Sequence, residues 1–304
     1  MNSPLWSGAP PRSAQPGTQL GAAASVILAV LVVLVVAVVA VVIASDPASA
    51  PRRSDGPVVR PTTRAIRDGP TSIPPGQGRT LVPLLPTTAL PLRVLEIGDS
   101  LGIDLGDQLK SQLDATGIAR TTVASVGDSG LSNTTYFDWP DHLAGLLNTD
   151  RPQIVVVFMG ANDDQGLYVN GMASAPDTLA WVEGYAQRVN DLVREATSFG
   201  ARVVWVGMPL MANPDLNAAV QRENAIYERE TKSFSATLYM SSSAVLDASG
   251  VYETNGEDSS GGLVALRTPD GVHLTPAGAG VLARAVIKAV DLQWDLTPGI
   301  PTVP

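Results

Sequence analysis

Cysteine is absent from the 304 residues, which excludes disulfide bonds, thiolate zinc sites and a cysteine nucleophile. Histidine is nearly absent, because only His142 and His273 occur, so any reaction that needs an imidazole depends on one of these two residues. Basic residues are also scarce, with 20 Lys and Arg against 29 Asp and Glu, whereas nucleic-acid-binding proteins carry clustered basic charge. We therefore expect no nucleic-acid partner. A hydrophobic content of 45% excludes a wholly disordered chain.

Charged residues are missing altogether between Gly21 and Ala44, where the chain reads GAAASVILAVLVVLVVAVVAVVIA. At about 1.5 Å per residue, a helix of this length crosses a hydrocarbon core of roughly 30 Å. The run predicts a transmembrane helix over 21–44, preceded by an N-terminal tail over 1–20. The alternative is a cleaved signal peptide, since Ala48-Ser49-Ala50 resembles a cleavage site, but the run exceeds the usual apolar region of about 7–15 residues.

Residues 45–91 are rich in proline among Ser, Thr, Gly and Arg, a composition that favours an extended tether over a packed core. Residues 1–91 hold seven Arg and three Asp, so this tether either rests against anionic lipid or is simply solvated. The basic residues on the two sides of the span, Arg12 before it and Arg52 and Arg53 after it, favour a cytoplasmic C-terminus. A long tether behind one span favours the opposite orientation, and we expect the following domain to lie outside the cytoplasm, in the cell envelope.

From Leu92 to Leu296 short apolar runs alternate with amphipathic stretches, which is typical of a parallel sheet covered by helices. The pattern predicts one three-layer α/β/α domain over 92–296 with a five-stranded parallel sheet, followed by a C-terminal tail over 297–304. The predicted strands are 92–97, 119–125, 153–159, 201–207 and 236–240. The last helix is expected after Thr275.

Four loops at the ends of these strands carry polar residues. Ser100 follows the first strand in Gly98-Asp99-Ser100, and Gly130 follows the second in Gly127-Asp128-Ser129-Gly130. Asn162 and Asp163 follow the third strand in Gly160-Ala161-Asn162-Asp163. Asp270 and His273 come after the fifth strand, three residues apart. Ligands bind at the carboxyl edge of open α/β sheets, so we expect these loops to meet there.

Together the loops contain the groups that acyl transfer by a serine requires. Ser100 is the candidate nucleophile, His273 the base that takes its proton, and Asp270 the acid that orients the imidazole. The backbone N–H groups of Ser100 and Gly130 and the side chain of Asn162 are the candidate oxyanion donors. Asp99 and Asp163 are expected to support them, Asp163 as a cap or local hydrogen-bond partner.

The same four blocks, GDS, the Gly of DSG, GAND and DGVH, resemble the successive blocks of the SGNH/GDSL hydrolase superfamily, in its order and over nearly all of 92–292. FMGANDDQ, WVGMP and LRTPDGVHLTPAG resemble a bacterial envelope-associated branch known mainly as a domain of unknown function. The resemblance implies a flavodoxin-like fold for the domain. It also implies Ser100, Asp270 and His273 as the triad, and Gly130 and Asn162 as oxyanion donors.

Gly98-Asp99-Ser100-Leu101-Gly102 also fits the nucleophile elbow of α/β-hydrolases, but two spacings argue against that fold. It builds its oxyanion loop from an earlier strand, whereas only the proline-rich tether precedes Leu92, and it takes its acid from a separate loop, whereas Asp270 lies three residues before His273.

Other residues have simpler interpretations. His142 is expected on the surface, in the first turn of a helix. The aromatic side chains of Tyr136, Phe137 and Trp139 either wall a substrate pocket or pack in the core. Asp163-Asp164 lacks the further oxygen ligands of a calcium loop, so we expect neither a metal nor another cofactor.

The sequence thus predicts a membrane-anchored serine esterase that removes an acyl group, with acetyl preferred, from a carbohydrate or glycolipid of the cell envelope. The alternatives are an O-acyltransferase that uses the same triad, a lysophospholipase-like lipid esterase, and a carbohydrate-binding module without activity.

Overall fold

The computed structural model describes residues 84–294 and 296. The predicted N-terminal tail, the predicted transmembrane helix over 21–44, residues 45–83 of the tether and the predicted tail over 297–304 lie outside the described residues. Within the described part of the chain, no helix combines the length and the apolar character that a membrane crossing requires.

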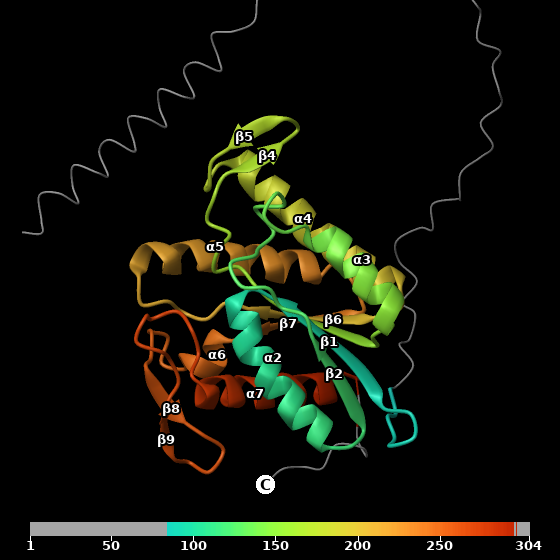
Figure 1. Cartoon of the computed structure of the whole chain (residues 1–304). Helices are drawn as coiled ribbons and strands as arrows, with labels where there is room; N and C mark the ends of the chain where they lie inside the picture. The colour runs from blue at the N-terminus through green and yellow to red at the C-terminus, as the bar shows by residue number, and fades with distance from the viewer. Residues whose placement is uncertain (1–83, 295, 297–304) are drawn as a thin grey trace, which may run out of the picture. The chain divides into compact units, whose positions relative to one another are not determined.

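A five-stranded parallel sheet forms the centre of the domain, as the sequence pattern predicts (Figure 1). Its strand order is β2-β1-β3-β6-β7, so β3 is the middle strand and β1 lies between it and the edge strand β2. Every residue of the central strand β3 is buried, because helices cover both faces of the sheet. The strands are β1 (Leu92–Gly98), β2 (Ala119–Val123), β3 (Ile154–Phe158), β6 (Arg202–Gly207) and β7 (Thr237–Ser241).

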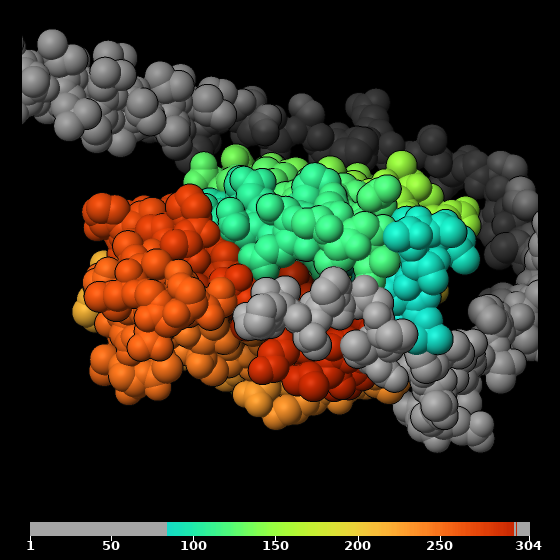
Figure 2. Space-filling view, turned by 90° about the horizontal axis from the view of Figure 1, so that it is seen from below, coloured from blue at the N-terminus to red at the C-terminus, as the bar shows by residue number. Residues whose placement is uncertain are grey.

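Helices on the two faces of the sheet complete the three layers (Figure 1). Helices α2 and α7 pack together on one face, and α3, α4 and α5 pack side by side on the other. In Figure 2 the green surface of α2 adjoins the orange and red surface of the last third of the chain. The helices are α2 (Ser100–Ala115), α3 (Trp139–Asp150), α4 (Leu179–Ser198), α5 (Pro214–Thr231), the short α6 (Ser243–Leu246) and α7 (Pro276–Trp294).

Two small antiparallel hairpins interrupt the alternation of strands and helices along the chain, and the sequence pattern did not predict them. The first joins β4 (Leu167–Val169) to β5 (Met172–Ser174) after the third strand of the sheet. The second joins β8 (Asn255–Glu257) to β9 (Leu263–Ala265) before the last loop. Each strand has three residues, too few for an alternating pattern to stand out.

One buried acid lies in the middle of the first strand. Glu96 is fully buried, and both its carboxylate oxygens lie within 2.9 Å of the Ser125 hydroxyl. Helix α2 passes close to this carboxylate because it has glycine there: a Cβ on Gly106 would lie 2.7 Å from Oε2. Burial raises the pKa of Glu96 well above its ordinary value, and the hydrogen bond from Ser125 offsets only part of this effect.

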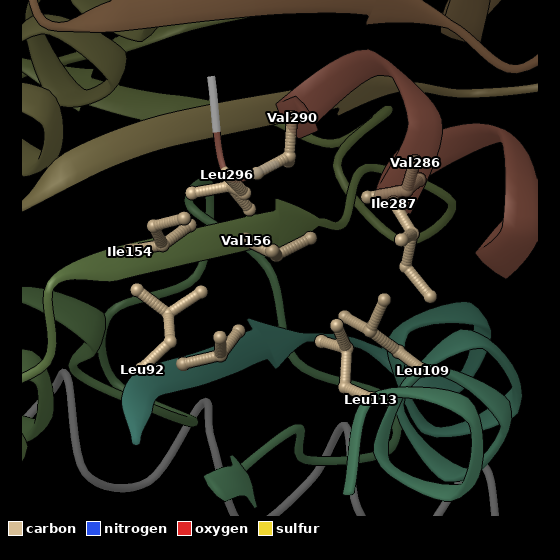
Figure 3. A pocket seen from close by; sticks show the side chains of 10 residues that line it. Leu92, Leu109, Leu113, Ile154, Val156, Val286, Ile287, Val290 and Leu296 are labelled. Atoms are coloured by element: carbon tan, nitrogen blue, oxygen red, sulfur yellow. The ribbon is translucent and has the colours of Figure 1, made fainter. Parts of the chain in front are cut away.

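A small internal cavity lies at the amino end of the sheet, between α2, α7 and the first residues of β1 and β3 (Figure 3). Its volume is about 10 Å³, and its lining is wholly apolar, including Leu92, Ile154 and Val290. A space of this size and character holds no ligand larger than a water molecule. Since Ser100 follows the other end of β1, this cavity is not the substrate site.

Candidate active site

The loop after β1 presents Ser100 at the first position of helix α2. Serine often caps a helix, but here Asp99 is the N-cap, because its Oδ1 accepts the backbone N–H of Leu101 at 2.9 Å. The Ser100 hydroxyl is therefore not used as a helix cap. The side chain is partly exposed at the carboxyl edge of the sheet, where a ligand can reach it.

Asp99 also joins two of the four predicted loops. Its Oδ2 accepts the backbone N–H groups of Gly160 at 2.9 Å and Ala161 at 3.0 Å, which fixes the loop after β3 beside Ser100. Burial raises the pKa of Asp99 to about 6, although these backbone hydrogen bonds act in the opposite direction.

A continuous chain of hydrogen bonds links Ser100, His273 and Asp270. The Ser100 Oγ lies 2.8 Å from His273 Nε2, and His273 Nδ1 lies 2.8 Å from Asp270 Oδ2. When Nδ1 carries a proton that it donates to Asp270, Nε2 has a free lone pair directed at the serine hydroxyl. The fold thus brings together a hydroxyl and an imidazole that are 173 residues apart in the chain.

The turn that carries His273 is organised by Asp270. Its Oδ1 accepts the Thr268 hydroxyl at 2.7 Å and the backbone N–H groups of Val272 at 2.8 Å and His273 at 3.0 Å. Partial desolvation raises the pKa of Asp270, but these bonds and the contact with the imidazole outweigh it and lower the pKa below its ordinary value. Asp270 is therefore ionised and orients the imidazole as a carboxylate.

The predicted oxyanion donors lie in neighbouring loops. The Asn162 Nδ2 donates to the backbone carbonyl of Ser129 at 3.0 Å, which places its amide beside Gly130 and leaves one amide hydrogen for a ligand. Ser100 is the first residue of α2, so its backbone N–H has no acceptor within the helix. Within residues 84–294, the backbone N–H of Gly130 has no backbone acceptor in the turns and loops. Three donors from three loops are thus available at the edge where Ser100 lies.

Asp163 holds the Gly130 loop against the Asn162 loop. Its carboxylate is fully buried and accepts four hydrogen bonds: from the Leu131 N–H at 3.0 Å, the Ser132 N–H and Oγ at 2.7 Å each, and the Tyr185 hydroxyl at 2.6 Å. A Cβ on Gly130 would lie 2.2 Å from Asp163 Oδ1, so glycine is required there. These bonded groups lie 22 to 32 residues away in the chain, so Asp163 supports the site through distant partners and not as a cap or local hydrogen-bond partner.

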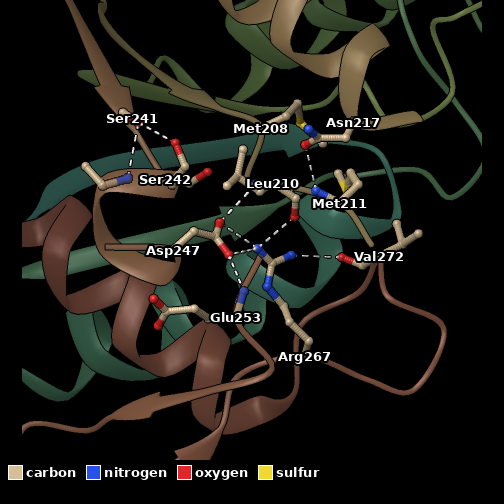
Figure 4. Close-up of polar contacts among 12 residues, drawn as sticks. Met208, Leu210, Met211, Asn217, Ser241, Ser242, Asp247, Glu253, Arg267 and Val272 are labelled. Carbon is tan, nitrogen blue, oxygen red and sulfur yellow. Dashed lines mark hydrogen bonds and ion pairs between the residues drawn. The ribbon is translucent and has the colours of Figure 1, made fainter. Parts of the chain in front are cut away.

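An ion pair inside the protein contacts Val272, the residue before His273 (Figure 4). The side chains of Arg267 and Asp247 are both fully buried, and Arg267 Nη2 lies 3.0 Å from Asp247 Oδ2. The same guanidinium donates to the carbonyls of Leu210 at 3.1 Å and Val272 at 3.3 Å. Because Val272 immediately precedes His273, this pair connects the segment that carries His273 to the loop after β6.

The remaining candidates lie apart from this chemistry. His142 is exposed in the first turn of α3, as predicted, with its ring 5.0 Å from that of Phe137. Trp139 is fully buried and packs in the core, where its indole N–H donates to the Ser129 hydroxyl at 3.1 Å and so supports the Gly130 loop. Tyr136 is largely exposed. In the described residues, no three His, Cys, Asp or Glu side chains are grouped to hold a metal ion.

Three groups near the triad were not identified from the sequence: Arg267, Asp247 and Asp104. Nothing local to Arg267 or Asp247 indicates that either is buried. Asp104 carries a visible signal, since it lies four residues after Ser100 and so shares its face of the helix. Its Oδ2 accepts the backbone N–H of Leu274 at 3.0 Å.

Comparisons with known proteins found a matching family model and similar solved structures. Residues 93–289 match the model of a family described as "Protein of unknown function (DUF459)". No curated protein matches the chain. Similar solved structures include a candidate SGNH hydrolase from Slackia heliotrinireducens, with 20% identity over 65% of this chain and 98% of that one and a TM-score of 0.44.

Two further solved structures carry esterase names. The psychrotrophic esterase EstA from Pseudoalteromonas sp. has 16% identity, covers 66% of this chain and 97% of its own, and gives a TM-score of 0.45. A catalytic mutant of Axe2, an acetylxylan esterase from Geobacillus stearothermophilus, has 14% identity to this chain. The match covers 66% of this chain and 94% of Axe2, and its TM-score is 0.43.

Proposed function

The chain belongs to the DUF459 family, an SGNH-like family of unknown function, and we propose that this member is a serine esterase that works through an acyl-enzyme. One observation carries the proposal: the unbroken hydrogen-bonded chain from Ser100 through His273 to Asp270, with 2.8 Å at each link. Serine is a weak nucleophile near neutral pH, and an adjacent base oriented by a carboxylate is what activates it.

In the proposed reaction Ser100 Oγ attacks the ester carbonyl while its proton passes to His273 Nε2. The oxyanion that forms accepts hydrogen bonds from the N–H groups of Ser100 and Gly130 and from the Asn162 amide. His273 then gives the proton to the departing alcohol, and the acyl group remains on Ser100. Water attacks this acyl-enzyme with His273 as base, and the free acid leaves while Ser100 regains its proton.

Access to solvent supports hydrolysis as the outcome over transfer to a second alcohol. The side chains of His273 and Asp270 are 37% and 51% exposed, so water can reach the base directly. An acyltransferase must keep water from the acyl-enzyme. Among residues 84–294 and 296, no side chain shields the imidazole from solvent in this way.

For the substrate we propose an O-acetyl ester on a carbohydrate or glycolipid of the cell envelope. The proposal is supported by the predicted transmembrane helix over 21–44 and the proline-rich tether, which would hold the domain near a membrane surface, outside the cytoplasm. A lipid ester is the second choice for the same reason.

The test uses the purified full chain with p-nitrophenyl acetate, with and without a sugar acceptor. We expect hydrolysis without acceptor, and its loss in Ser100→Ala but not in the control Ser198→Ala, whose serine is exposed at the end of α4. A fluorophosphonate probe should label Ser100 alone. Turnover only with acceptor would indicate a transferase. Neither turnover nor labelling would indicate a binding module and would refute the esterase proposal.

A further inference from the structure

Helix α2 carries a second polar group that faces the candidate base. Asp104 lies one turn after Ser100, and its Oδ2 accepts the backbone N–H of Leu274 at 3.0 Å. Leu274 directly follows His273, so this bond ties the segment that carries the base to the helix that carries the nucleophile. The two bonded residues are 170 positions apart in sequence.

The Asp104 carboxylate is partly buried and interacts electrostatically with His273. Burial raises its pKa, while the hydrogen bond from Leu274 and the charge of a protonated His273 lower it. A partly buried carboxylate attracts a nearby cation more strongly than one in bulk water does. The imidazole becomes such a cation when it accepts the proton of Ser100.

Other charged and titratable groups also meet this loop. Asp270 contacts the imidazole itself, and Arg267 donates to the Val272 carbonyl. Tyr252, whose hydroxyl lies 3.7 Å from the position of a Cβ on Gly271, approaches from the segment before the β8–β9 hairpin. On α2, Asp107 lies one turn beyond Asp104 and is exposed. A test of Asp104 must therefore separate its charge from the charges of these neighbours.

We propose that Asp104 is a second positioning carboxylate for His273: it fixes the backbone next to the imidazole against α2 and stabilises the imidazolium that forms during acyl transfer. The catalytic part of this inference, the stabilisation of the imidazolium, rests on the proposed function. The contact with the histidine segment is independent of any activity.

The experiment measures the protonation of His273 directly. The full chain contains two histidines, so its NMR spectrum holds one Cε1–H signal from each imidazole, and His142→Gln assigns them. Asp104→Asn keeps an oxygen for the Leu274 N–H but removes the charge. We expect the midpoint of the His273 titration to fall by about 0.5 to 1 pH unit in Asp104→Asn, because an adjacent anion favours the charged imidazole. The matched control Asp107→Asn, on the same helix, should move it much less.

Activity provides the second arm. A fall of that size corresponds to an approximately 3- to 10-fold weaker preference for the imidazolium, so kcat should drop about 3- to 10-fold with little change in KM. Asp104→Ala leaves the Leu274 N–H without an acceptor as well, so its kcat should fall further than that of Asp104→Asn. Asp104→Glu keeps the charge, so its His273 titration midpoint should stay near that of the unmodified chain. Asp104→Ser, also uncharged, replaces Asp104→Asn if that variant does not fold.

The outcomes distinguish this proposal from the esterase proposal. A lowered midpoint without any esterase activity would support the role of Asp104 at the histidine and refute the proposed function. Two results would overturn the role of Asp104 and leave the esterase proposal intact. The first is full esterase activity and an unchanged His273 titration midpoint in both Asp104→Asn and Asp104→Ser. The second is a change of the midpoint in Asp107→Asn as large as that in Asp104→Asn.

Discussion

Replacing Asp163 by asparagine tests whether a buried carboxylate joins the two oxyanion loops. Each carboxylate oxygen accepts one backbone N–H and one hydroxyl, Oδ1 from Ser132 and Oδ2 from Leu131 and Tyr185. An asparagine has only one acceptor oxygen. Whichever way the amide turns, its NH₂ group faces a buried backbone N–H that then has no acceptor.

The magnitude follows from these contacts. An orphaned buried N–H costs about 1–3 kcal/mol, and hydrogen bonds to a neutral acceptor are weaker than those to a carboxylate by about 1 kcal/mol. Part of this cost is returned because the buried charge disappears: burial is the largest influence on the Asp163 pKa and raises it. We therefore expect Asp163→Asn to lower the free energy of unfolding by about 2–3 kcal/mol. Because the Gly130 loop loses its anchor, kcat should also fall about 10-fold or more.

The assay is urea unfolding of the full chain, in mild detergent because of the predicted membrane segment, followed by tryptophan fluorescence at pH 7. Asp164→Asn is the matched control: this neighbouring acid is exposed and pairs with Arg222 at 2.8 Å, a surface contact worth about 0–1 kcal/mol. Equal losses of stability in the two variants would refute the role that we assign to Asp163.

Three further predictions concern other buried or coupled groups. Asp270→Asn should lower kcat about 10²- to 10⁴-fold without unfolding the protein, because the amide no longer selects the imidazole tautomer; steady-state kinetics check this, and unchanged kcat would contradict it. The folded-state pKa of Glu96 lies above its unfolded value, so its ionisation costs stability as the pH rises above about 4.5. Glu96→Gln should therefore raise the melting temperature at pH 8 but not at pH 4, and equal changes at both would be inconsistent with this sign. Arg267→Met leaves the Asp247 charge buried without its partner and should cost about 3–5 kcal/mol in denaturant unfolding. The double variant with Asp247→Leu should recover much of that loss, and a double variant as unstable as the single one would argue against the ion pair.

The sheet was predictable from the sequence because strands that are buried on both faces are continuous runs of apolar residues. Strand β3 reads IVVVF and lies within one residue of the predicted 153–159 at each end. The second strand ends at Val123, two residues earlier than predicted. The two hairpins were missed because three-residue strands carry no usable periodicity.

The candidate site was predictable in its chemistry but not in its support. Ser100, Asn162 and His273 are visible because polar groups follow apolar strands, and parallel strands bring such groups to one edge. The contacts of Asp163 with Leu131 and of Asp104 with Leu274 depend on how distant loops pack, which no local spacing encodes. The sequence also gives no sign of the buried pair of Arg267 and Asp247. Charged residues are normally exposed, and only the structure shows that these two are enclosed.

The hydrogen bond between Ser100 and His273 joins the first loop of the sheet to the loop that precedes its final helix. A chain emerging from the ribosome thus contains Ser100 long before it contains His273. If the proposed mechanism holds, it cannot attack an ester until nearly the whole domain has been synthesised and α7 has packed against α2. The reactivity of Ser100 toward esters therefore reports that the domain has folded. Chains that end before α7 should show no such reactivity.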